Sequence, residues 1–172
     1  GALRYREVLP LKKAGINYLA LGHIHKSYVE DDWIFNPGSI EANNVEESQF
    51  DRGAFLVEID KKGKIKAELK MDYQQRPIVR LQQKMRTSDL IEAVEEGAIA
   101  LIDKAIRSKQ IIPAQQPIVE LRITGNVGFD RLDLDTRALQ KTLQEKCQAL
   151  IFLLRYDVEE ADYASPISDE AS

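Results

Sequence analysis

Hydrophobic and polar positions alternate in the first half of the chain in short segments typical of strands. The clearest segment is 64–72, where Ile65 and Leu69 alternate with charged residues, which predicts the second strand of a hairpin whose first strand covers 53–60. The same pattern predicts a short helix and three more strands, at 4–14, 16–22, 33–35 and 78–82. The strand at 16–22 is apolar on both faces, so we expect it to be buried.

After residue 86 the apolar spacing changes to that of a helix. One apolar stripe predicts a helix over 89–109, with Thr87 or Ser88 as its cap; the stripe consists of Leu90, Val94, Ala98, Leu101 and Ala105. We expect Gly125–Gly128 to form a plain turn rather than a nucleic-acid clamp, and Cys147 to be a core residue. The remaining elements are expected as a strand, a helix and a strand at 118–124, 135–147 and 150–158.

The character of the chain changes near Arg76 and Pro77. Before this point it is rich in strands, and after it a β-α-β-α-β pattern would form a small layer of its own. We therefore predict an α+β protein with a domain over 1–75, a second domain over 76–158 and a flexible acidic tail over 159–172.

Composition restricts the location of the protein. The longest apolar run, Ala149–Leu154, has six residues, far fewer than the roughly 20 needed to span a bilayer, so we expect no membrane association. Cys147 is the single cysteine, which rules out an internal disulfide and favours a reducing compartment. We expect a cytoplasmic protein.

Positive charge is concentrated in one part of a chain whose net charge is −4. Residues 61–86 contain nine basic and two acidic side chains, and such a strip is attractive to a phosphate backbone. The alternative is an ordinary solvated strand face. The residues we predict to contact DNA or another phosphate substrate are Lys64, Lys66, Lys70 and Arg80.

His23 and His25 are the only histidines of the chain, and they directly follow Gly22. Residues at i and i+2 of a strand share one face, so we expect two imidazole ligands side by side. Two metal ions roughly 3.5–4 Å apart, each bound by one of them, would suit hydrolysis of phosphate esters. A turn follows at Asn36-Pro37-Gly38-Ser39, and proline followed by glycine favours a type II turn that would line the same site with Asn36, Gly38 and Ser39.

The segments Gly22-His23-Ile24-His25 and Asn36-Pro37-Gly38-Ser39-Ile40-Glu41 together resemble the last metal-binding motif of the calcineurin-like metallophosphoesterases. More narrowly, the chain is similar to the SbcD-type DNA repair exonucleases. That similarity rests on three further segments, Arg52–Asp60, Gln75-Arg76-Pro77 and Leu132-Asp133-Leu134-Asp135. The resemblance implies the end of a metallophosphoesterase β-sandwich followed by a capping domain that helps to hold DNA.

The family's other motifs, which include an Asp-x-His and a Gly-Asn-His-Asp, are not found in this chain. By resemblance, the chain is expected to be the C-terminal part of a nuclease that hydrolyses phosphodiester bonds with two divalent metal ions, manganese in the family. His23 and His25 would then bind one ion each. The resemblance also implies DNA as substrate, a homodimer of the full-length enzyme, and an SMC-type coiled-coil ATPase as partner.

Two other functions are consistent with the same residues. One is a different calcineurin-like phosphodiesterase that acts on a small substrate, although the basic strip argues against it. The other is a non-catalytic module for DNA binding or subunit docking. Because the chain supplies two of the many ligands that a two-metal site requires, we expect it to be inactive alone.

Overall fold

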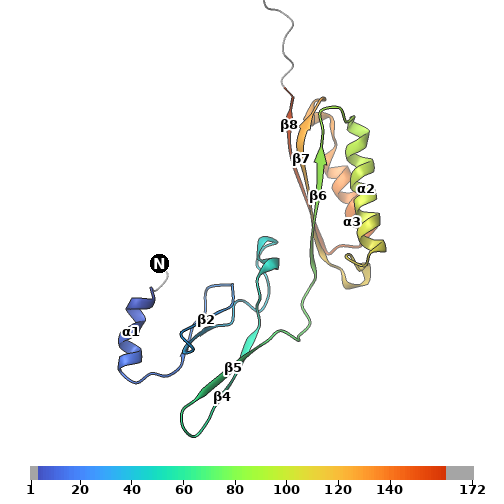
Figure 1. Cartoon of the computed structure of the whole chain (residues 1–172). Coiled ribbons are helices and arrows are strands. Elements are labelled where there is room, and N and C mark those ends of the chain that lie inside the picture. Colours follow the sequence, from blue (N-terminus) through green and yellow to red (C-terminus); the bar gives the residue numbers. More distant parts are fainter. Residues whose placement is uncertain (1–3, 162–172) are drawn as a thin grey trace, which may run out of the picture. The chain divides into compact units, whose positions relative to one another are not determined.

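The structure is a computed structural model that describes residues 4–161 (Figure 1). The chain divides into two compact units, and the division falls between Gln75 and Arg76. We call the part before this division unit 1 and the part after it unit 2. Helices and small sheets occur in both units, so the predicted α+β class is confirmed.

Unit 1 begins with a helix and a three-stranded sheet. Helix α1 (Tyr5–Lys13) precedes strands β1 (Leu19–Ala20), β2 (Tyr28–Glu30) and β3 (Ile34–Asn36). The strand order is β1-β3-β2, and β3 pairs in parallel with β1 and antiparallel with β2. Trp33 and Ile34 are buried and pack with Val8 of α1 in a small core, as expected for the apolar segment at 33–35.

The rest of unit 1 is a 3₁₀ helix and the predicted hairpin. The 3₁₀ helix spans Glu46–Gln49, and the hairpin consists of β4 (Ala54–Ile59) and β5 (Ile65–Lys70). Its antiparallel register joins Ala54 to Lys70 and Ile59 to Ile65. Ile65 and Leu69 are half-buried while Lys66 is exposed, so the predicted alternation of β5 is confirmed.

The prediction of a long buried strand at 16–22 is wrong. Only Leu19 and Ala20 are in strand conformation, and Ala20 is exposed. Ile16 is 38% exposed. The reason is that β1 lies at an edge of the sheet and pairs with β3 alone, so the apolar residues of this segment are not covered on both faces.

Unit 2 contains a three-stranded parallel sheet with two crossover helices. The strands β6 (Ile78–Met85), β7 (Ile118–Val127) and β8 (Ile151–Glu160) lie in the order β6-β7-β8. Helices α2 (Ile91–Arg107) and α3 (Thr136–Cys147) connect them and lie on the same face of the sheet (Figure 1). Two 3₁₀ turns occur in the connections, at Pro113–Gln115 and Arg131–Asp133.

The main core lies between these helices and the sheet. Cys147 is buried there, as predicted, and burial raises the pKa of its thiol. Many of the fully buried side chains come from α2, α3 and β7; they include Val94, Ala98, Ile102, Leu143, Val119, Leu121 and Ile123. Parallel strands that are buried this way are rich in branched apolar residues, which is what the sequence of β7 provides.

The N-terminal cap of helix α2 differs from the prediction. Helix α2 has Leu90 at its N-cap, without a side-chain hydrogen bond, so neither Thr87 nor Ser88 caps it. The Asp89 carboxylate instead accepts from the Arg86 backbone N–H, which turns the chain just before the helix. In contrast, Asp135 caps α3 by accepting from two backbone N–H groups.

The predicted turn at Gly125–Gly128 is also wrong, because β7 continues through Val127. Gly125 pairs with Met85 on one side and Val158 on the other. A Cβ atom at Gly125 would lie 2.3 Å from the Met85 carbonyl oxygen. The glycine therefore allows a close approach between strands instead of a reversal of the chain.

The chain after residue 158 was predicted to be an acidic tail. Strand β8 runs to Glu160, so the first two residues of the segment belong to the sheet, and 162–172 lie outside the described residues. None of the helices within residues 4–161 is long and apolar enough to cross a lipid bilayer.

Candidate functional site

Both histidines lie in the loop that joins β1 to β2. Strand β1 ends at Ala20, so the expected arrangement of His23 and His25 on one face of a strand is wrong. His23 has a positive φ of 72°, which non-glycine residues adopt only where the local structure requires it. The loop bends at this point, so strand geometry does not orient the two rings.

The segment 36–39, at the end of β3, holds this loop through hydrogen bonds. The fully buried Asn36 side chain donates from Nδ2 to the carbonyl oxygens of Ile24, at 2.8 Å, and of Lys26, at 2.9 Å. The Ser39 N–H donates to the carbonyl oxygen of His25, at 3.2 Å. The two halves of the predicted motif, separated in sequence, thus form one unit centred on the backbone of His25.

Gly38 permits this contact. Its φ is +81°, a left-handed value that favours glycine. Residues 37–39 are neither a hydrogen-bonded turn nor a bend, so the predicted type II turn is not formed. The Cα atom of Gly38 also approaches the loop so closely that a Cβ atom would lie 2.6 Å from the His25 carbonyl oxygen. A Cβ atom at Gly22, by contrast, would meet no atom within 4 Å, so the structure shows no close contact that requires a glycine at this position.

A carboxylate that the sequence did not reveal contacts His25. The Oε1 atom of Glu47 lies 2.9 Å from His25 Nδ1. The side chain of Glu47 is 12% exposed and that of His25 is 35% exposed. The Asn43 amide nitrogen lies beside the same ring, 3.3 Å from Nδ1 and 3.4 Å from Nε2. His25 is therefore held from one side by a carboxylate and open on another.

Glu47 is itself fixed by its loop. Its Oε2 accepts from the Asn43 backbone N–H at 2.9 Å, and its Oε1 accepts from the Asn44 side chain at 3.0 Å. The bond from Asn43, followed by the bond from His25, lowers the pKa of Glu47. The buried Arg52 donates from Nη2 to the Glu47 carbonyl oxygen. Sequence reasoning missed Glu47 because an acidic residue in a polar loop has no periodicity or spacing that marks it.

Two buried polar atoms of the segment 36–39 remain without a hydrogen-bond partner in the described part of the chain, namely Asn36 Oδ1 and Ser39 Oγ. Buried polar atoms are usually paired. His25 Nε2 has the Asn43 amide nitrogen at 3.4 Å, so a ligand that binds this nitrogen would have to replace that contact. The chemistry of these atoms, an imidazole nitrogen with neutral oxygens, suits a divalent metal.

Residues 4–161 contain no cluster of three or more His, Cys, Asp or Glu side chains that would hold a metal ion. The two histidines fit the role of one ligand each in a larger site, but they do not make a metal site by themselves. Asp130 and Asp135 cap a 3₁₀ turn and α3, respectively, so these aspartates have structural roles.

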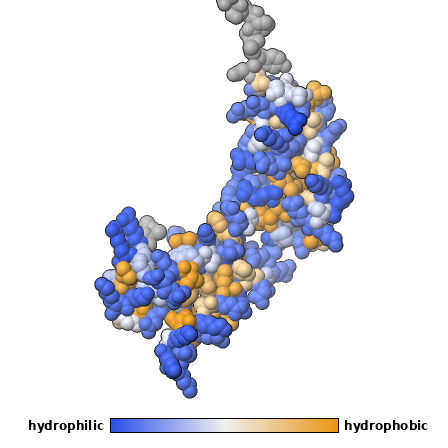
Figure 2. All heavy atoms as spheres, in the orientation of Figure 1, coloured by the Kyte–Doolittle hydropathy of each residue, from blue (hydrophilic) through white to orange (hydrophobic). Residues whose placement is uncertain are grey.

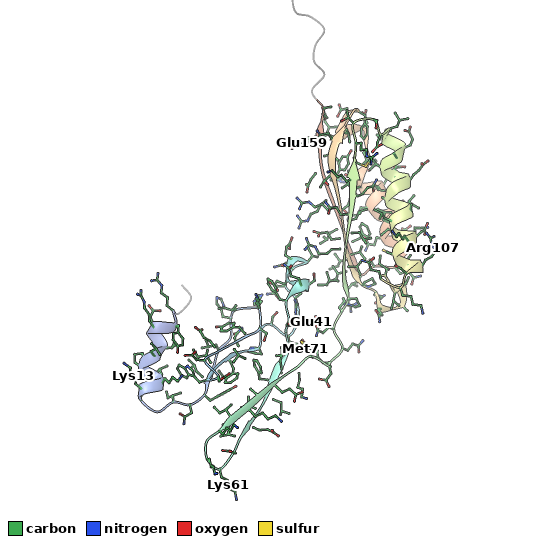
Figure 3. All side chains as sticks on the ribbon, viewed as in Figure 1. Lys13, Glu41, Lys61, Met71, Arg107 and Glu159 are labelled. Atoms are coloured by element: carbon green, nitrogen blue, oxygen red, sulfur yellow. The ribbon has the colours of Figure 1, made fainter. Side chains whose placement is uncertain are left out.

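The predicted phosphate-binding residues are divided between the units. Lys64, Lys66 and Lys70 lie on the hairpin, whose tip carries Lys61 (Figure 3), while Arg80 belongs to β6 in unit 2. Three of the four already contact carboxylates. Lys66 Nζ is 3.8 Å from Glu58, Lys70 Nζ is 2.6 Å from Glu68, and Arg80 Nε is 2.8 Å from Glu120. The positive charge of the strip is therefore partly neutralised within the protein.

Arg80 is part of an ion-pair cluster on the sheet face opposite the helices. Glu120 is only 2% exposed and accepts from Arg80 Nε at 2.8 Å and from Arg155 Nε at 2.6 Å. Burial raises the pKa of Glu120, but the hydrogen bonds from the two arginines outweigh it, so the net pKa lies below its ordinary value. Arg122 pairs with Asp157 on the neighbouring strand at 2.9 Å.

No protein-family model matches the chain, and a search of curated proteins finds no significant match.

Proposed function

We propose that this chain is the C-terminal part of a manganese-dependent DNA repair exonuclease of the SbcD type. Unit 1 would be the end of the metallophosphoesterase domain, and unit 2 the capping domain. The observation that carries the proposal is the contact between the segment from Asn36 to Ser39 and the His25 loop. The two segments with which the sequence resembles the family's last metal-binding motif pack together as one site.

In the complete site, His23 and His25 would each supply one nitrogen ligand. A pair of divalent metal ions polarises the phosphodiester and activates water for in-line displacement. The residues of this chain hold and orient the ligands: Asn36 fixes the backbone on both sides of His25, and Gly38 allows the segment 36–39 to come close. Carboxylate ligands, which manganese favours, would come from other parts of the enzyme.

The exposed surface of unit 1 supports the proposal that this unit is part of a larger domain. Large apolar side chains lie open to solvent on this unit, and hydrophobic surface is visible there in Figure 2. The most exposed members are Met71 at 48%, Leu56 at 53%, Ile40 at 56% and Ile59 at 61%. Exposed apolar surface, where it is contiguous, commonly marks a contact with other protein. A metallophosphoesterase domain of which unit 1 is one part would cover these residues.

Within this proposal, DNA is the substrate, the enzyme acts as a homodimer, and an SMC-type ATPase is its partner. The lysines of the hairpin would contact the phosphate backbone, which carries most of the affinity in sequence-independent binding. The second candidate function is a non-catalytic DNA-binding or docking module. It is favoured by the lack of a three-residue metal cluster within residues 4–161.

The test compares residues 1–172 alone with the longer protein that this proposal implies. We expect the longer protein to degrade linear duplex DNA in the presence of manganese, and the isolated chain to hydrolyse neither DNA nor bis-p-nitrophenyl phosphate. If the isolated chain turns over the ester and His23→Ala/His25→Ala abolishes that turnover, the reading as an incomplete site is wrong. If the longer protein binds DNA but never cleaves it, the non-catalytic module is the better description.

A further inference from the structure

The contact between Glu47 and His25 assigns different environments to the two ring nitrogens of His25. Nδ1 lies 2.9 Å from a carboxylate oxygen, and a carboxylate accepts hydrogen bonds but has no proton to donate. In the neutral ring, the proton must therefore be on Nδ1 for this hydrogen bond to form. The Nε2 atom then carries the lone pair and is the nitrogen that can bind a metal ion or accept a proton. The Asn43 amide nitrogen lies 3.4 Å from Nε2, and a metal ion would replace this weak contact.

The carboxylate is held in place independently of the histidine. The bonds from the Asn43 backbone and the Asn44 side chain reach both oxygens of Glu47. The Glu47 backbone N–H donates in turn to Asn44 Oδ1 at 3.0 Å. Arg52 binds the Glu47 carbonyl oxygen from the other side. A glutamate whose carboxylate is bonded at both oxygens and whose backbone is bonded at two further points can impose an orientation on the ring, rather than follow it.

We propose that Glu47 is a positioning residue that fixes His25 in the tautomer with its proton on Nδ1 and thereby presents Nε2 as a preformed ligand. Carboxylates in this position commonly orient metal-binding histidines and raise their basicity. The binding of a divalent metal by Nε2 depends on the proposed function. The effect of Glu47 on the tautomer of His25 does not depend on the proposed function, because it follows from contacts within unit 1.

The two histidines are thus not equivalent. Within residues 4–161 the ring of His23 makes no hydrogen bond, and its side chain is exposed on a backbone with φ +72°. No contact of this kind fixes its tautomer, so we infer that His23 adapts to its ligand, whereas His25 is oriented beforehand. This difference makes His23 an internal control for any effect attributed to Glu47.

The tautomers can be measured directly by NMR. The two-bond nitrogen–proton correlations of the imidazole rings distinguish Nδ1–H from Nε2–H, and the chain has two histidines, so His23→Gln assigns the spectrum. At about pH 8, where an ordinary histidine is neutral, we expect His25 to be mainly the Nδ1–H tautomer. We expect His23 to show mainly the Nε2–H form that free histidine favours.

Glu47→Ala should shift His25 to mainly Nε2–H while leaving His23 unchanged. Glu41→Gln, at an exposed glutamate of the same loop that Figure 3 labels, should change neither ring. A wild-type His25 that is mainly Nε2–H would overturn the proposal, and so would a folded Glu47→Ala variant that keeps the Nδ1–H form. If Glu47→Ala disturbs the loop, the tautomer of His25 in the wild-type protein still tests the proposal. In Glu47→Gln the amide oxygen can accept the hydrogen bond from Nδ1–H, so this variant should retain part of the Nδ1–H population.

A manganese titration of the full-length enzyme separates this inference from the proposed function. Loss of the positioning carboxylate should weaken manganese binding by roughly 10–100-fold, the range typical of groups that orient a metal ligand, with Glu41→Gln unchanged. Equal manganese affinity in Glu47→Ala and wild type would contradict the role of Glu47 as a positioning residue. If the wild-type protein shows the Nδ1–H tautomer but binds no manganese, the proposed function fails while the hold of Glu47 on His25 is established.

Discussion

A Cβ atom at Gly38 would lie 2.6 Å from the carbonyl oxygen of His25. This relationship ties the segment that follows β3 to the loop that carries both histidines, and it explains why a residue without a side chain is required at this point. It also yields a simple test, because other glycines of unit 1 adopt similar backbone angles without such a neighbour.

Gly38→Ala should destabilise unit 1 more than Gly63→Ala. Gly63 has a φ of +77° but open space around it, while Gly38 combines a φ of +81° with the close contact. Left-handed backbone alone costs about 1–2 kcal/mol for a residue with a side chain, which we expect for Gly63→Ala. Gly38→Ala should exceed this value. Denaturant unfolding followed by the fluorescence of Trp33, the only tryptophan and 3% exposed, measures both. Equal losses would argue against the close contact.

Asn36→Ala should loosen the histidine loop. The substitution leaves the carbonyl oxygens of Ile24 and Lys26 without their donor, and unpaired buried groups cost about 1–3 kcal/mol. Asn36→Asp should destabilise unit 1 at least as much, because it places a carboxylate oxygen next to the two carbonyl oxygens that accept from Asn36 Nδ2. The readouts are the Trp33 unfolding transition and the line widths of the two imidazole rings in NMR spectra. If both variants leave the transition and the rings unchanged, Asn36 does not hold the loop.

Glu120→Gln should destabilise unit 2 at neutral pH by about 1–3 kcal/mol. Removing one partner of a buried ion pair costs roughly 3–5 kcal/mol, but the side chains of Arg80 and Arg155 are 41% and 49% exposed, and solvent screens part of that value. Asp157→Asn removes an exposed pair with Arg122 and should cost less than about 1 kcal/mol. The protection of the buried thiol of Cys147 from a thiol reagent measures the opening of unit 2 in both variants.

The effect of Glu120 should depend on pH in a defined direction. Its folded-state pKa is lowered, so its ionised form contributes stability above the unfolded-state pKa of about 4.3. That contribution is lost as the pH falls from this value through the folded-state pKa. The difference in unfolding free energy between wild type and Glu120→Gln should therefore shrink when chemical unfolding, followed by circular dichroism, is repeated at about pH 3. A difference that grows on acidification would mean that the carboxyl is protonated in the native state.

Reversing Lys64, Lys66 and Lys70 to Glu should reduce the salt dependence of duplex binding. Each lost phosphate contact lowers the slope of log affinity against log salt by roughly 0.9. A matched control reverses Lys104, Arg107 and Lys109 at the end of α2, which changes the net charge equally. If the two triple variants lower the slope equally, the effect is one of overall charge, and the hairpin lysines have no specific contact with DNA.

The hairpin and the parallel layer of unit 2 were predictable because their apolar spacing is strong and local. Ile65 and Leu69 alternate with charged residues, and the stripe through Val94 and Ala98 has helical spacing. The segment 16–22 was mispredicted because an apolar run does not reveal whether strands flank it on both sides. Gly125 was mispredicted because glycine serves both turns and close strand pairing.

The candidate site was predictable only in part. His25, Asn36 and Gly38 were recognised from residue types and spacing, and the structure brings them together. Glu47 was not, because its contact with His25 depends on how a polar loop folds back over 22 residues. The ion pairs of Lys66, Lys70 and Arg80 were likewise hidden, since a charge count along the chain does not show which carboxylates neutralise these residues.

The most direct test of the proposed exonuclease site is a paired measurement on the full-length protein that contains this chain. Manganese-dependent degradation of linear duplex DNA and metal-free DNA affinity are measured for wild type, His25→Ala and Gln49→Ala, an exposed neighbour of Glu47. We expect His25→Ala to lower the cleavage rate by at least roughly 10–100-fold and to change DNA affinity by less than about 1 kcal/mol. The control Gln49→Ala should change neither the cleavage rate nor the DNA affinity. Normal cleavage by His25→Ala would contradict the assignment of His25 as a metal ligand.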